Sequence, residues 1–148
     1  MKIRSFGMQS DIAVNAPGER VWAVFADAVR WPQWSPVCTE VWGDLDSLWA
    51  TGAHLGFRLR MAGRRVPFLV EIIESDPPHR VVWSSTKFTV TAKRTFTFTP
   101  VAGGTRVTDR KEFSSTALPV GLWYPRRVIR TMTERWLGDM KAEAERRQ

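Results

Sequence analysis

The stretch APGERVWAVFADAVRWPQWSP, residues 16–36, decides the fold of this chain. Pro17 ends an extended segment and opens a helix, because proline has no N–H and its φ already suits a first helical turn. Val21, Val24 and Phe25 then recur at helical spacing. The stretch therefore predicts a short helix directly after a first strand.

Two tryptophans with prolines beside them follow this helix. Trp31 directly precedes Pro32, and Trp34 is followed by Ser35 and Pro36. Proline disfavours helical geometry in the residue before it. The segment is therefore expected to form a rigid aromatic corner rather than a continuation of the helix.

Length and composition are those of one globular domain. The chain has 148 residues, of which 43% are hydrophobic, enough to bury a packed core. No apolar run reaches the length of a membrane span, and the first residues show no signal peptide, so a cytoplasmic location is expected. Cys38 is the only cysteine, which excludes an intrachain disulfide and a cysteine-based metal cluster.

The net charge of +7 raises the question of a nucleic-acid partner. Arginines cluster around residues 58–65 and 126–130, but acidic residues lie among them and no nucleic-acid-binding motif accompanies them. No nucleic-acid partner is expected. Arg126 and Arg127, which follow Trp123 and Tyr124, favour a weak contact with an anionic membrane surface.

Most of the remaining chain has the alternation of β-strands. Seven stretches show it, at residues 6–15, 37–43, 53–61, 65–75, 80–85, 88–99 and 105–113. The turn after the third places Phe57 opposite Phe68, and the turn after the sixth places Phe98 opposite Val107. Consecutive hairpins make the sheet antiparallel. A long amphipathic helix is expected over about residues 125–146.

The pattern APxxRVWxVFxD at residues 16–27, followed by WxxWxP at residues 31–36, resembles the START-like (SRPBCC) superfamily. This superfamily includes polyketide cyclases, lipid-transfer domains and the birch pollen allergen, and the resemblance covers essentially the whole chain. It implies an α+β helix-grip fold, in which a curved antiparallel sheet of six to seven strands wraps around a long C-terminal helix. Two short helices would follow the first strand, and a cavity for a hydrophobic ligand would lie between sheet and helix.

Apolar residues of the expected concave face, and others around the last helix, are candidates to bind such a ligand. They are Leu55, Phe57, Leu59, Phe68, Val70, Phe96, Phe98, Val107, Trp123, Met132 and Trp136. The ligand class implied is a lipid-like or polyketide-like small molecule. The alternative is that these side chains simply fill a core, as apolar stripes usually do.

Charged residues fall on the same face of the predicted sheet. Arg94 would lie opposite Lys111, with Asp109 diagonal to Arg94. Because burying an unpaired charge is costly, the cluster indicates either a lined cavity with a ligand anchor or strands that bend and expose these side chains. The exposed arrangement is slightly favoured.

Three functions remain open, and ligand binding is favoured because no acid–base constellation stands out. A polyketide cyclase or dehydrase would use Arg94 as oxyanion stabiliser, Asp109 as base or orienting group and Tyr124 as proton donor. A non-enzymatic interaction or accessory module is the third. No metal site and no cofactor is expected, since the chain has two isolated histidines and no phosphate-binding loop. The protein would be a monomer or a homodimer.

Overall fold

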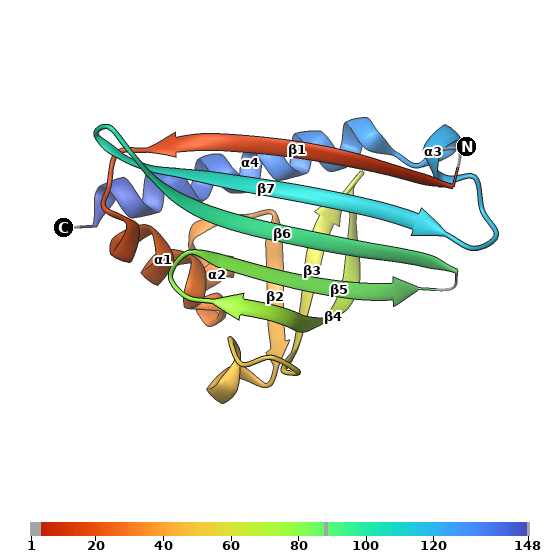
Figure 1. Cartoon of the computed structure of the whole chain (residues 1–148), viewed down its shortest axis with the longest axis horizontal. Helices are drawn as coiled ribbons and strands as arrows, with labels where there is room; N and C mark the ends of the chain where they lie inside the picture. Colours follow the sequence, from red (N-terminus) through yellow and green to blue (C-terminus); the bar gives the residue numbers. More distant parts are fainter. Residues whose placement is uncertain (1–3, 88, 148) are drawn as a thin grey trace.

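A curved sheet with one long helix along it makes up the structure (Figure 1), a computed structural model that describes residues 4–87 and 89–147 without the side chains of residues 122 and 123. The strands are β1 (Ser5–Val14), β2 (Cys38–Gly43), β3 (His54–Met61), β4 (Arg64–Asp76), β5 (Arg80–Lys87), β6 (Val90–Val101) and β7 (Gly104–Ser115). The helices are α1 (Gly18–Ala26), α2 (Trp31–Trp34), α3 (Val120–Trp123) and α4 (Arg126–Arg146), with short 3-10 turns at Ala28–Arg30 and Leu45–Ser47.

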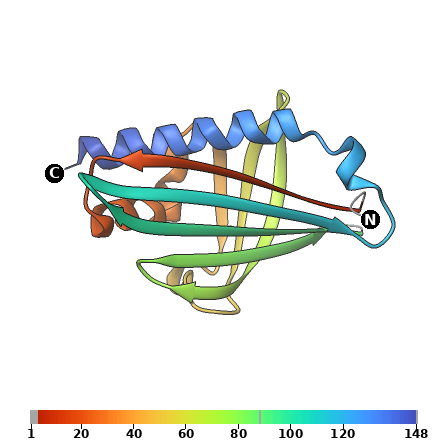
Figure 2. The same ribbon diagram turned by 45° about the horizontal axis from the view of Figure 1, so that its top comes forward.

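The strands form one antiparallel sheet in the order β1-β7-β6-β5-β4-β3-β2. Consecutive strands from β2 to β7 are hairpin partners, and β1 closes the order by pairing with β7. Register shifts near Ile72 in β4 and near Cys38 in β2 are irregularities of the kind that bend a sheet. Figure 2 shows α4 lying lengthwise along the curved sheet. This is the helix-grip fold that the resemblance implies.

The predicted strand registers are confirmed. Phe57 pairs with Phe68, and Phe98 pairs with Val107. Arg94 pairs with Lys111, as the turn after β6 requires. Strand and helix bounds differ from the predicted ones by a few residues at most, and Phe88, where the sixth strand was expected to begin, lies outside the described residues.

The aromatic corner is in part helical, and here the expectation for Trp31 is wrong. Trp31 has helical angles, φ −49° and ψ −45°, although it precedes a proline, and α2 begins at this residue. Pro32 occupies the first turn of α2, where its missing N–H is no loss. The indole Nε1 of Trp31 donates a hydrogen bond of 2.9 Å to the carbonyl of Phe25, which holds the turn against α1. Ser35, before Pro36, is extended as expected.

The two ends of the sheet are packed differently. At one end, α1 inserts Phe25 among aromatic rings, with centroid distances of 4.8 Å to Phe96 and 5.2 Å to Phe98. At the other end, a small cluster of Met8, Phe113 and Ile129 forms the core. The end with α1 is therefore filled by aromatic rings, whereas the opposite end has a smaller core.

Candidate ligand-binding site

A pocket of about 70 Å³ lies between the concave face of the sheet and α4. Strands β3 to β7 supply most of its wall, and Tyr124 with the first half of α4 supplies the rest. The lining residues are Phe57, Leu59, Met61, Phe68, Val70, Trp83, Ser85, Ala92, Lys93, Arg94, Lys111, Phe113, Tyr124, Ile129 and Met132. Apolar side chains dominate this wall, so the pocket suits an apolar molecule.

The structure brings part of the sequence-predicted set together at this pocket. The lining includes the predicted residues Phe57, Leu59, Phe68, Val70, Arg94, Tyr124 and Met132. Trp136 lies beside it, in a smaller recess of about 10 Å³ that Arg94 and Met132 also line. The prediction did not name Met61, Ser85, Ala92, Phe113 and Ile129, although strand alternation places Met61 on the face of Leu59.

Other predicted residues lie away from the pocket. Leu55, Phe96, Phe98 and Val107 are fully or almost fully buried in the main core and do not line it. Phe96 and Phe98 pack against α1 instead, a contact that strand alternation does not predict. The side chain of Trp123 lies outside the described residues.

Arg94, Asp109 and Lys111 form a buried charge cluster, in which Arg94 and Lys111 line the pocket and the predicted residue Asp109 lies behind them, outside the lining. Nη2 of Arg94 donates to Oδ2 of Asp109 over 2.6 Å, and Nε donates to both carboxylate oxygens over 3.0 and 3.2 Å. Nζ of Lys111 donates to the same Oδ2 over 3.1 Å. The side chains of Arg94, Asp109 and Lys111 are 14%, 0% and 8% exposed. The solvent-exposed arrangement, slightly favoured from the sequence, is therefore wrong, because α4 covers this part of the sheet.

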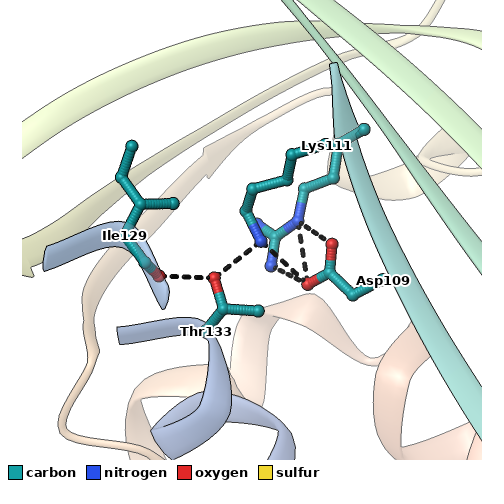
Figure 3. A network of polar contacts seen from close by, with 5 residues as sticks. Asp109, Lys111, Ile129 and Thr133 are labelled. Atoms are coloured by element: carbon teal, nitrogen blue, oxygen red, sulfur yellow. Dashed lines mark hydrogen bonds and ion pairs between the residues drawn. The ribbon is translucent and has the colours of Figure 1, made fainter. Parts of the chain in front are cut away.

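Helix α4 reaches the charge cluster through Thr133, a residue that sequence reasoning missed. Figure 3 shows Lys111 extended between Asp109 and Thr133. Nζ of Lys111 donates to the Thr133 hydroxyl over 2.6 Å, and that hydroxyl donates to the carbonyl of Ile129 over 2.7 Å. The available signal was a hydroxyl within the apolar stripe of the last helix, one turn after Ile129.

Aromatic rings surround the guanidinium of Arg94. Its Cζ lies 4.6 Å from the centroid of Phe96, 5.5 Å from that of Trp136 and 5.6 Å from that of Trp83. Such cation–π contacts stabilise a cation that has left water. Together with Asp109 they fix Arg94 in one orientation at the pocket.

The pKa values of the cluster follow from burial and from its unequal charges. Burial alone would raise the pKa of Asp109, but the charges of Arg94 and Lys111 and their hydrogen bonds hold it below its usual value. Burial, together with the positive charge of Arg94, lowers the pKa of Lys111 to about 7, although Asp109 acts in the opposite direction. Lys111 can therefore gain or lose a proton near neutral pH.

Tyr124 lies at the pocket end near α3. Burial raises the pKa of its phenol, and its ring packs 4.8 Å from that of Phe113. Nearby, Cζ of Arg126 lies 4.3 Å from the ring centroid of Phe6, so part of the basic pair proposed to meet a membrane contacts the protein itself. Contact with a membrane stays a prediction.

Among the described residues, no group of three or more His, Cys, Asp or Glu side chains could hold a metal ion. In that same part of the chain, no helix combines the length and the hydropathy of a membrane span.

An antiparallel sheet that grips a long helix defines the class of helix-grip domains. The chain belongs to the polyketide cyclase / dehydrase and lipid transport family, whose model matches residues 5–145. No curated protein sequence matches it significantly.

Solved structures show the same fold. The Zhui aromatase/cyclase from Streptomyces sp. R1128 has a TM-score of 0.78 at 17% identity, over 97% of this chain and 95% of that one. The di-domain ARO/CYC BexL from the BE-7585A biosynthetic pathway has a TM-score of 0.81 at 18% identity, over 99% of this chain but 52% of BexL. Major latex-like protein 151 from Panax ginseng has a TM-score of 0.78 at 10% identity, over 95% and 98% of the two chains.

Proposed function

We propose that this protein is a single domain that binds a hydrophobic or aromatic small molecule in the pocket between the sheet and α4. The observation that carries the proposal is an apolar pocket whose wall contains two largely buried cationic side chains, Arg94 and Lys111. Apolar pockets with a few convergent polar groups are the usual form of small-molecule sites. Membership of the polyketide cyclase / dehydrase and lipid transport family supports the same ligand class.

The pocket volume bears on how a ligand enters. Small-molecule sites measure about 300–1,000 Å³, whereas this pocket measures about 70 Å³. A ligand of more than a few heavy atoms therefore requires lining side chains to move. Met61 and Met132 are suited to this, because unbranched methionine side chains adapt to irregular spaces.

Native mass spectrometry of the purified protein, followed by organic extraction, tests the proposal directly. A stoichiometric lipid or aromatic compound is expected, or quenching of tryptophan fluorescence by a member of a panel of fatty acids, sterols and polyphenols. A ligand-free mass without quenching by any panel member would contradict ligand binding. It would favour the interaction-module alternative.

A pocket-filling variant locates the site. Ala92→Phe adds a ring to the lining of the pocket, so it should weaken binding at least about tenfold by steric exclusion. Thr99→Phe adds the same ring at an exposed position of the same strand and should bind like the wild type. Equal affinities of the two variants would place the ligand elsewhere.

A cyclase or dehydrase is the second candidate function, supported by the likeness to aromatase/cyclases and by Lys111. Asp109 is fully buried and bound by two cations, so within this proposal it orients Arg94 and Lys111 rather than acting as the base. Lys111 would transfer the proton, and Arg94 would stabilise an enolate oxygen. Turnover of a β-polyketone that survives in Lys111→Met would contradict this role.

A further inference from the structure

The charge cluster contains more positive than negative charge. Arg94 on β6 and Lys111 on β7 share one carboxylate, that of Asp109. The other titratable side chains in the described lining are Tyr124 and Lys93, of which Lys93 is exposed and pairs in register with Glu112. Helix α4 contributes the neutral Thr133. With both cations charged, one positive charge in this buried cluster has no counter-ion within the described residues.

A surplus charge away from water is relieved either by losing a proton or by gaining an anion. A guanidinium group does not lose its proton in proteins. Lys111 is therefore the group that releases one, in agreement with a pKa lowered to about 7 by burial and by Arg94. An anion brought by a ligand would reverse this change.

We infer that the ligand of this pocket carries one acidic group, such as a carboxylate or an ionised enol, and that Lys111 takes up a proton when this group binds. The inference rests on the proposed ligand-binding function and specifies its substrate class. The acidic group would supply the counter-charge that the cluster lacks.

Donors for the acidic group are in place. The ammonium of a protonated Lys111 has three N–H groups, of which Asp109 and Thr133 accept two. Nη1 of Arg94 has no hydrogen bond to any described residue, whereas Nε and Nη2 are held by Asp109. Both side chains line the same pocket, so an oxygen atom of a ligand there can meet both.

The proposal predicts how affinity depends on pH. Below about pH 7 Lys111 is already protonated, and the affinity for a carboxylate is at its maximum. Above that pH binding must include uptake of a proton, so Kd should rise by up to about tenfold per pH unit. A neutral ester of the same acid lacks the counter-charge and should show no such rise.

Calorimetry with matched pairs tests the inference. The probes are decanoate, cinnamate and naphthoate, each with its methyl ester, in two buffers of different ionisation enthalpy at about pH 8. The acids should bind with uptake of close to one proton per ligand, and near pH 6.5 about tenfold or more tightly than their esters. Esters that bind as tightly as the acids, or acids that bind without proton uptake, would overturn the inference and leave ligand binding intact. If neither acids nor esters bind, the proposed function itself fails.

The Lys111→Met variant separates the contribution of Lys111 to binding of the acidic group from that of Arg94. This variant keeps the neutral Arg94–Asp109 pair and removes the titrating amine, so proton uptake and the preference for acids should disappear while ester binding persists. Lys87→Met removes an exposed lysine of β5 that does not line the pocket, and this variant should keep both properties of the wild type. Persistent proton uptake in Lys111→Met would assign it to another group and overturn the inference.

Discussion

Asp109 is the residue on which the buried charge cluster depends. Its fully buried carboxylate accepts hydrogen bonds from Arg94 and Lys111 and is their shared counter-ion. Removing one partner of a buried ion pair lowers stability strongly, because it leaves a buried charge without a counter-ion. Removing a surplus buried charge leaves no such unpaired group. Replacing Asp109 should therefore cost much more stability than replacing Lys111.

Asp109→Asn should lower the free energy of unfolding by about 3–5 kcal/mol, because two buried cations lose their counter-ion. Lys111→Met should change it by no more than about 1 kcal/mol, because a methionine suits the apolar surroundings and Arg94 keeps its partner. Guanidinium chloride denaturation at neutral pH measures both. Equal losses in the two variants would show that the cluster is not held by charge balance.

Lys111 should also make stability depend on pH. Its pKa falls from 10.5 to about 7 on folding, so above pH 7 the unfolded chain binds a proton that the folded chain has released. The free energy of unfolding should therefore rise with pH between about pH 7 and pH 10.5, by at most about 1.4 kcal/mol per pH unit. Asp109 affects stability only at acidic pH, because its pKa is lowered in the folded protein. As the pH falls through this lowered pKa, the carboxylate is protonated and its contribution to stability is lost.

Urea denaturation at about pH 7 and about pH 8.5 isolates the effect of Lys111 when wild type and Lys111→Met are compared. Higher pH is avoided because burial raises the pKa of Tyr124 and raises that of Cys38 to about 11. Titration of these two groups lowers the free energy of unfolding as the pH rises further. A rise with pH that is the same in both proteins would contradict the assignment to Lys111.

At the scale of elements, strand alternation predicted which residues share a face but not what covers them. Phe57 and Phe96 both face the concave side, yet Phe57 lines the pocket and Phe96 packs under α1. The sequence pattern is the same for both, because alternation depends only on the strand itself. The position of α1 and the coverage by α4 separate core from pocket.

Gly104 lies where two elements approach closely, whereas Gly138 has open space around it. A Cβ at Gly104 would lie 2.0 Å from the carbonyl oxygen of Val14, where the β6–β7 turn crosses the end of β1. Gly104→Ala should therefore destabilise the protein by about 2 kcal/mol or more, since backbone must move. Gly138, within α4, has nothing within 4 Å of its Cβ position, and Gly138→Ala should stabilise by about 0.5–1 kcal/mol. Thermal unfolding of the two variants checks both, and a stabilising Gly104→Ala would contradict the close approach.

At the scale of the whole molecule, β1 pairs with β7 and α4 packs along β1, so the first and last elements are joined. Lys141 on α4 also donates a 3.0 Å hydrogen bond to the carbonyl of Ala13. Elements joined in this way should unfold together. Far-ultraviolet circular dichroism and tryptophan fluorescence should report one coincident transition, and two separate midpoints would argue against a single cooperative domain.

The sequence by itself determined the strands, the registers of the β3–β4 and β6–β7 hairpins and the long helix, because alternation, turn residues and helical spacing are properties of neighbouring residues. It also brought Arg94, Asp109 and Lys111 to one face, since strand parity follows from the register. Only the tertiary structure decided that these charges are buried, because Thr133 and the rest of α4 arrive from a distant part of the chain. The same long-range packing shifted the pKa of Lys111, since burial and the charge of Arg94 act through space rather than along the chain.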